Sequence, residues 1–171
     1  MTQCIFSPPK KLTSISEWGR YESELYEIFK RDILENKWLS FRGKPVNIRW
    51  RDQFIYDKEK EFWHLIYQDQ GKKTADYEDR YPDYERACRL HWIKEFIDNE
   101  NICLHRELDD CESCYGYVDL KEGIRSRFFF PDLRYLIVLE EKASFWILIT
   151  AYYVGREHEY KKLMRKAGFV K

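Results

Sequence analysis

Three short segments of this chain carry residue types suited to breaking a phosphodiester bond without a metal ion. The first is FWHL (62–65), in which His64 follows two aromatic residues. Histidine can serve as general base or general acid because its pKa lies near neutrality. In metal-free RNA cleavage, a base takes the 2′-hydroxyl proton and an acid protonates the 5′ leaving oxygen. A structural histidine in an aromatic strand is the alternative, and it stays open.

The second segment, 83–98, is predicted to be a helix with arginines inside its apolar arc. Arg86 and Arg89 fall between Leu90, Ile93 and other apolar residues on a helical wheel. A guanidinium on a buried stripe needs a partner, because its desolvation is expensive. The partner is either a structural carboxylate or a phosphate bound in a cleft.

The third segment, 145–154, is predicted to be a central strand, since it is apolar on both faces. Its alternation predicts one face with Trp146, Leu148, Thr150 and Tyr152, and an opposite face with Ile147, Ile149, Ala151 and Tyr153. The hydroxyls of Thr150 and Tyr152 could hold a phosphate, and the Tyr152 ring could stack on a base. Ordinary strand propensity also explains both residues.

Further basic residues could bind RNA beside these segments. Arg125 and Arg127 are predicted to share a strand face with Phe129. Arginines interleaved with aromatic residues suit a surface that holds phosphates and bases, although they equally suit a half-exposed strand. Arg156 and His158 follow the last strand, and His158 is a second acid–base candidate.

Helical periodicity comes first along the chain and strand periodicity afterwards. Ser14 and Glu17 form a possible capping box for a helix through Leu34. The remaining early elements are short strands at 38–41, 46–50 and 61–67, a polar loop at 68–81, and a helix from Pro82 to about Asn99.

The second half predicts an antiparallel meander with strands at 116–120, 124–130, 135–140 and 145–154, then a basic C-terminal helix within 156–171. We therefore expect an α+β fold with N-terminal helices packed on a four-stranded antiparallel sheet. Residues 1–13, with Pro8 and Pro9, are expected to be a flexible arm, and residues 14–171 a single domain.

Composition sets wide limits on function. Hydrophobic residues make up 44% of the 171 residues, enough for a core. The sequence has no apolar run of membrane-spanning length and no signal-peptide core, which favours a cytoplasmic protein without a membrane partner. A net charge of zero argues against bulk electrostatic coating of nucleic acid, but it permits a local basic face.

A cysteine-rich stretch raises the question of a structural zinc ion. Cys103, His105, Cys111 and Cys114 could supply four ligands. The first pair is spaced too tightly for the usual ligand patterns, so we expect reduced thiols in a solvent-facing loop instead. No metal and no other cofactor is expected.

Four segments in this order resemble the phage-associated branch of the barnase–EndoU–colicin–RelE-like nuclease superfamily. They are FWHL (62–65), RLHWI (89–93), RYLIVLEE (134–141) and ILITAYYVGREHEYKKL (147–163), and the likeness covers roughly residues 20–165. The resemblance implies a barnase/RelE-like fold and a metal-independent endoribonuclease that forms a 2′,3′-cyclic phosphate. Carried onto this sequence, it implies catalytic roles for His64, Arg89, Thr150 and Tyr152. The cysteine-rich insert and the neutral charge depart from many toxin members.

Two functional hypotheses follow. The first is a toxin of phage, plasmid or bacterial conflict that cleaves tRNA or mRNA, with an antitoxin or immunity protein as its partner. The second is a non-catalytic RNA- or protein-binding module on the same scaffold, which would bind through Arg125, Arg127 and the basic tail.

Overall fold

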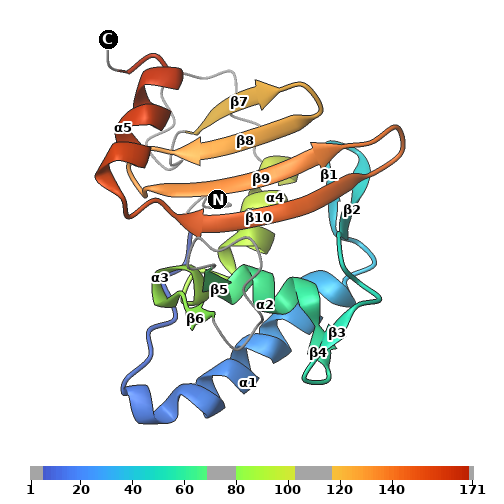
Figure 1. Ribbon diagram of the computed structural model, residues 1–171. Helices are drawn as coiled ribbons and strands as arrows, with labels where there is room; N and C mark the ends of the chain where they lie inside the picture. The colour runs from blue at the N-terminus through green and yellow to red at the C-terminus, as the bar shows by residue number, and fades with distance from the viewer. Residues whose placement is uncertain (1–5, 69–79, 103–116, 170–171) are drawn as a thin grey trace.

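The computed structural model describes residues 6–68, 80–102 and 117–169. These residues form an α+β protein with an N-terminal helix, a mixed sheet that curls into a half-barrel, and a C-terminal helix (Figure 1). The main sheet has six strands in the order β1-β2-β10-β9-β8-β7.

The helical elements are η1 (Ile15–Glu17), α1 (Trp18–Phe29), η2 (Lys30–Leu34), α2 (Lys60–Ile66), α3 (Tyr84–Ala87), α4 (Trp92–Ile102) and α5 (Glu157–Lys166). The strands of the main sheet are β1 (Ser40–Phe41), β2 (Lys44–Ile48), β7 (Val118–Glu122), β8 (Arg125–Phe130), β9 (Tyr135–Glu141) and β10 (Trp146–Tyr153). Two small ribbons complete the fold, β3 (Phe54–Ile55) with β4 (Lys58–Glu59) and β5 (Tyr67–Gln68) with β6 (Tyr81–Pro82).

The expected meander is present as β7 to β10, but the expectation of a purely antiparallel, four-stranded sheet was wrong. β2 pairs in parallel with the first half of β10, and β1 pairs antiparallel with β2. Arg42 (φ 48°) and Gly43 (φ 78°) form the two-residue turn between β1 and β2, in the positive-φ conformation that tight hairpins require. The apolar first half of β10 thereby gains a paired neighbour on each edge.

The predicted first helix is confirmed as η1, α1 and η2, which run without a break from Ile15 to Leu34. The predicted capping box is absent. Ser14 makes no side-chain cap and lies 2.9 Å from the hydroxyl of Ser16, while the Glu17 carboxylate accepts a hydrogen bond from Thr13. The apolar spacing of the helix therefore determined it more strongly than the cap did.

Residues 61–67 were predicted to be a strand, but most of them form helix α2. The aromatic residues favoured a strand by propensity, whereas the segment is buried on nearly all sides, as a helix packed between other elements is. Glu61, Phe62, Trp63, Leu65 and Ile66 are buried, and His64 is half-buried. His64 therefore projects from a helix and not from a strand.

The predicted helix 82–99 is divided into α3 and α4. Pro82 lies in β6, and the Asp83 carboxylate caps α3 by accepting the amide of Arg86 at 3.0 Å. Between the helices, the amides of Arg89 and Leu90 bond three residues back, to Arg86 and Ala87, at 3.2 Å each. The division allows Arg86 and Arg89 to contact different parts of the protein.

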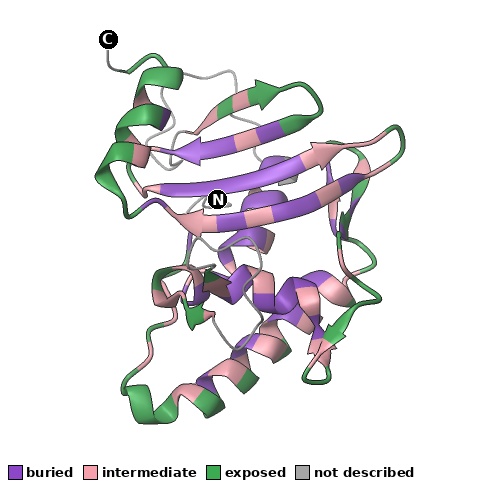
Figure 2. Cartoon of the chain, in the orientation of Figure 1, coloured by how far each residue is buried: buried purple, intermediate pink, exposed green. Residues whose placement is uncertain are grey.

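The main core lies between the helices and one face of the curled sheet, which we call the inner face. Phe41 is fully buried there, with ring centroids 5.6 Å from Phe96, 5.2 Å from Phe128 and 5.3 Å from Trp146. In Figure 2 the buried residues are concentrated on β9, on α4 and on α2. A smaller cluster on the outer face packs Phe129 and Leu136 against Leu163 of α5.

The segment expected to be a flexible arm contacts the domain from Phe6 onward. The Phe6 ring lies 4.9 Å from Trp92 and 5.2 Å from Phe130. The Lys10 amide donates to the Cys88 carbonyl at 2.8 Å, and the Tyr21 hydroxyl donates to the Lys10 carbonyl at 2.7 Å. Residues 6–10 thus pack against α4 and against the link that precedes it.

Phe41→Ala should lower the free energy of unfolding by about 3–5 kcal/mol, because it leaves a cavity where β1, α4 and the sheet meet. Urea denaturation measures the change. Phe54→Ala is the matched control, since Phe54 is 62% exposed and should cost less than about 1 kcal/mol. Equal losses in the two variants would show that Phe41 does not join these elements.

Candidate functional site

A β-bulge in β10 changes which of its residues share a face. Leu148 pairs with Leu139 and Thr150 with Val138, so one extra residue lies on the β10 side. As a result Trp146, Leu148 and Ala151 join the main core, whereas Ile149 joins the outer cluster and Tyr152 packs against it. The predicted face of Trp146, Leu148, Thr150 and Tyr152 was therefore wrong, since the bulge reverses the alternation.

Thr150 and Tyr152 still lie on one face after the bulge. Their cross-strand partners, Val138 and Leu136, both belong to the outer cluster, and directly opposed residues of an antiparallel pair share a face. Both residues are half-buried. This part of the prediction is confirmed, although the face is the one against which α5 packs.

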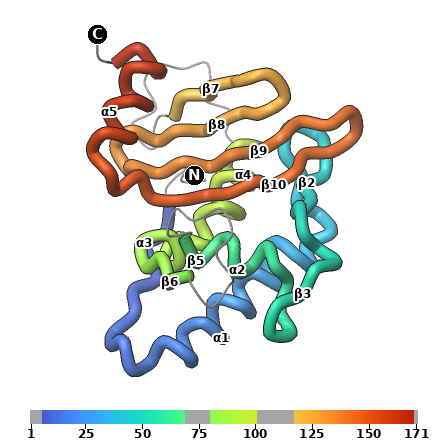
Figure 3. Tube along the Cα trace, in the orientation of Figure 1, coloured from blue at the N-terminus to red at the C-terminus, as the bar shows by residue number. Residues whose placement is uncertain are grey.

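β2 and β10 separate halfway along β10. Their pairing ends at Ile48 and Leu148, after which the chain leaves the sheet toward β3 (Figure 3). Helices α2 and α3 contact β10 instead. Arg49 and Trp50 stand where β2 departs, beside the start of α2.

These elements bring together a cluster that we call the Trp50 platform, made of Arg49, Trp50, Lys60 and His64. The Arg49 guanidinium carbon lies 3.7 Å and the Lys60 ammonium 4.7 Å from the centroid of the Trp50 ring. The His64 ring meets Trp50 edge-on, with centroids 5.1 Å apart and planes at 88°. Arg49 is exposed and the other three are half-buried, so the platform reaches the surface.

Glu61 lies fully buried in the first turn of α2, next to the platform. Neither of its carboxylate oxygens has a hydrogen bond of normal geometry. Burial raises the pKa of Glu61 to about 8, against the opposing influence of the Arg49 charge and the Trp50 backbone. The Glu61 carboxyl, three residues before His64, is therefore neutral in the folded protein up to a pH well above its ordinary pKa.

Arg86 connects the helix of His64 to the strand of Tyr152. Its Nη1 donates to the carbonyls of His64, at 2.9 Å, and Tyr67, at 3.3 Å. Its guanidinium carbon lies 5.2 Å from the Tyr152 ring centroid. The Tyr152 hydroxyl donates to Glu159 at 2.7 Å, and burial raises the pKa of that phenol. Arg86 therefore fixes α2 against the second half of β10.

Arg89 was expected to act together with His64, but it contacts a different group of side chains. Its Nη1 donates to the Glu85 carbonyl at 2.7 Å and to the Glu85 carboxylate. Its guanidinium carbon lies 5.2 Å from the Trp92 ring and 4.6 Å from the Tyr153 ring. Of the predicted residues, the contacts of Arg86 thus link His64 and Tyr152, while Arg89 lines a separate pocket.

The other predicted RNA-binding residues lie on β8 and α5. Arg125 pairs with Glu140 at 3.0 Å, and Arg127 pairs with Glu122 at 3.4 Å. Their charges are therefore partly neutralised at the surface. Arg156 and His158 are exposed at the start of α5. Contact of these four residues with RNA stays a prediction.

The possible zinc ligands Cys103, His105, Cys111 and Cys114 lie outside the described residues. Within residues 6–68, 80–102 and 117–169, no three histidine, cysteine or acidic side chains are grouped so that they could hold a metal ion. None of the helices in those same ranges is both long and apolar enough to cross a membrane.

One usable signal for the platform residues is present in the sequence, and our prediction missed it. Had 60–66 been assigned to a helix, Lys60 and His64 would have fallen on one face at i and i+4. Trp50 and Arg49 could not be placed from sequence, because nothing local shows where β2 leaves the sheet.

Comparison with known proteins gives no relative. No protein-family profile matches the chain, and neither the curated proteins nor the solved structures contain a significant match.

Stability should fall with rising pH because of Glu61. The folded protein keeps Glu61 protonated up to a pKa of about 8, whereas the unfolded chain ionises near 4.5. The folded state therefore binds the extra proton, and the free energy of unfolding should decrease by up to about 1.4 kcal/mol per pH unit between these values. Glu61→Gln should remove this decline and be the more stable protein at pH 8, as measured by urea denaturation at pH 5 and pH 8.

The control is Glu27→Gln, since Glu27 is exposed and pairs with Lys30 at 2.7 Å. It should keep the pH dependence of the parent. Parallel stability curves for the parent and Glu61→Gln would show that Glu61 does not titrate in this range.

Proposed function

We propose that this protein is a metal-independent endoribonuclease and that the Trp50 platform is its active site. One observation carries the proposal: an imidazole meets an indole ring that also holds two cationic side chains, at the protein surface. These groups combine proton transfer, phosphate neutralisation and base stacking in one place.

In the proposed reaction, the 2′-hydroxyl oxygen attacks the adjacent phosphorus and the bond to the 5′ oxygen breaks. His64 removes the 2′-hydroxyl proton or protonates the leaving oxygen, and solvent water carries out the other of these two proton transfers. Arg49 and Lys60 neutralise the charge that builds on the phosphate. The products are a 2′,3′-cyclic phosphate and a 5′-hydroxyl, and no metal takes part.

The resemblance to the barnase/RelE-like superfamily supports this proposal through its helices and antiparallel meander. Under the proposal, β7 to β10 correspond to the four-stranded sheet, and β1 and β2 extend it. Tyr152 and Thr150 would bind RNA on the strand that Arg86 joins to α2. Arg89 would not take part in the reaction, because its contacts lie elsewhere.

A ribonuclease that harms its host cell requires an inhibitor. The proposal therefore includes a toxin role in phage, plasmid or bacterial conflict, tRNA or mRNA in the cytoplasm as substrate, and an antitoxin or immunity protein as partner.

The second candidate function is RNA binding without cleavage. Proteins that bind single-stranded nucleic acid without sequence preference combine aromatic rings with cationic side chains, as Trp50 does with Arg49 and Lys60. The arrangement of Arg49, Trp50 and Lys60 fits both functions. Replacement of His64 distinguishes them, because only cleavage requires an acid or base.

The test is incubation of the purified protein with total tRNA and with a structured mRNA in EDTA. We expect discrete fragments that end in 2′,3′-cyclic phosphates. His64→Ala should cut about 10²–10⁴ times more slowly, the usual contribution of general acid–base catalysis. The matched control is His91→Ala, since His91 lies in the link between α3 and α4 and should leave cleavage unchanged.

Intact RNA at high protein concentration would refute the ribonuclease. If that RNA were nevertheless retained by the protein in a mobility-shift assay, and Trp50→Leu released it, the binding function would be correct instead. Undiminished cleavage by His64→Ala would remove His64 from the site.

A further inference from the structure

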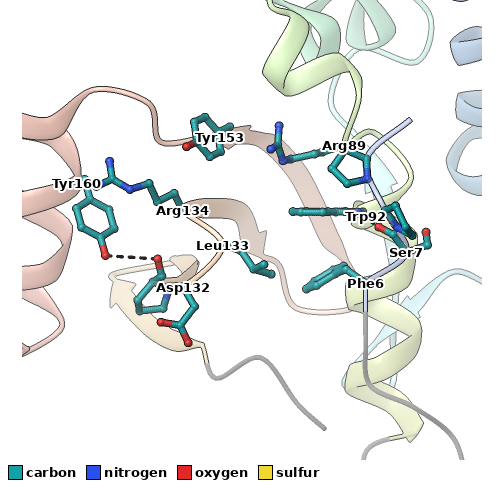
Figure 4. A pocket seen from close by; sticks show the side chains of 12 residues that line it. Phe6, Ser7, Arg89, Trp92, Asp132, Leu133, Arg134, Tyr153 and Tyr160 are labelled. Carbon is teal, nitrogen blue, oxygen red and sulfur yellow. Dashed lines mark hydrogen bonds between the residues drawn. The ribbon is translucent and has the colours of Figure 1, made fainter. Parts of the chain in front are cut away.

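A pocket of about 790 Å³ lies where the N-terminal segment, the start of α4, the turn between β8 and β9, and the end of β10 meet (Figure 4). Such a volume is typical of sites for small organic ligands. Arg89, Arg134, Tyr153 and Tyr160 are among its lining residues, and none of them belongs to the Trp50 platform.

Arg89 is held on one side of this pocket with part of its hydrogen-bonding capacity unused. Its side chain is 13% exposed, and its buried Nε has no hydrogen-bond acceptor. The Trp92 and Tyr153 rings position the guanidinium. Because this guanidinium lines the pocket, an anion that enters there would gain from its charge.

Arg134 supplies a second guanidinium from the β8–β9 turn. Its carbon lies 3.9 Å from the centroid of the Tyr160 ring, and its Nη2 lies 2.9 Å from Glu157. Its backbone has a φ of 49°, a conformation that a residue with a Cβ adopts only at a cost. The amide of Val154 donates to the Arg134 carbonyl at 2.6 Å and helps to keep it there.

The charge of the pocket favours an anionic ligand. Two arginines line it against one aspartate, Asp132. The carboxylates that pair with the arginines, Glu85 and Glu157, are 54% and 57% exposed, so they can turn toward water when a stronger anion enters. Two guanidinium forks suit a phosphate group, which each can bind through paired hydrogen bonds.

The tyrosine rings favour a planar group attached to that phosphate. Tyr153 and Tyr160 are half-buried and line the same pocket as the arginines (Figure 4). We propose that this pocket binds a nucleoside monophosphate, with the phosphate between Arg89 and Arg134 and the base against Tyr153 or Tyr160. The nucleotide can be free or can form the 5′ end of an RNA strand. This site is separate from the proposed cleavage site.

Calorimetric titration with the four common 5′-ribonucleoside monophosphates tests the proposal, with inorganic phosphate and adenosine as partial ligands. At least one nucleotide should bind with an affinity at least about tenfold higher than that of inorganic phosphate or adenosine. Arg134→Gln should weaken nucleotide binding by about 10- to 100-fold, the effect of losing a charged hydrogen-bonding partner. Arg89→Gln should have a similar effect if circular dichroism shows that it is folded.

Arg20→Gln is the matched control, since the Arg20 side chain lies on α1 and is 82% exposed. It should bind nucleotide as the parent does. A 5′-phosphorylated tetranucleotide distinguishes the two sources: equal or tighter binding assigns the pocket to strand ends, and weaker binding assigns it to free nucleotides.

Three results would overturn the proposal. They are the absence of saturable binding at millimolar nucleotide, binding that Arg134→Gln leaves intact, and binding that Trp50→Leu abolishes, which would place the nucleotide on the Trp50 platform. Because no step measures RNA cleavage, failure here leaves the proposed ribonuclease untouched.

Discussion

The incomplete pairing of β10 is the constraint on which the rest of this structure depends. The strand is bonded to β9 along its whole length but to β2 only as far as Leu148. Its second half would expose an open edge if nothing packed there, and exposed edges invite pairing with other chains. Helices α2 and α3 pack there, and Arg86 joins them by bonding to two carbonyls of the α2 region while lying beside Tyr152.

The same constraint separates two chemically different regions. Where β2 departs, Trp50 meets His64 and two cations. Where β10 ends, Tyr153 meets Arg89 and the pocket behind the N-terminal segment. Because zero net charge leaves little surplus positive charge, local arrangement must decide where an anion binds. In both regions the arginines lie over aromatic rings, which attract cations without neutralising them.

The sequence predicted the individual helices and strands better than the way in which they pair and pack. Strands β8 to β10 follow from alternation and short links, and helix α1 follows from apolar spacing. The parallel pairing of β2 with β10 joins segments about a hundred residues apart, so no local pattern reveals it. Helix α2 was missed because Phe62 and Trp63 favour strands in isolation, while burial by β10 and α1 decides the outcome. The candidate site suffered from the same errors: His64 was chosen from the sequence, its helical neighbours Lys60 and Glu61 were overlooked once 61–67 was assigned to a strand, and Trp50 could be associated with them only in three dimensions.

The bulge at Ile149 also decides which of two neighbouring tyrosines faces which side of the sheet. If every residue of β10 paired one for one with β9, Tyr152 would face the helices and Tyr153 would face α5, so the two tyrosines would exchange surroundings. Deletion of Ile149 would instead leave the pairs Thr150–Val138 and Tyr152–Leu136 unchanged and would remove only the bulge. Diverged chains that lack this one residue should therefore keep both tyrosines on their present faces.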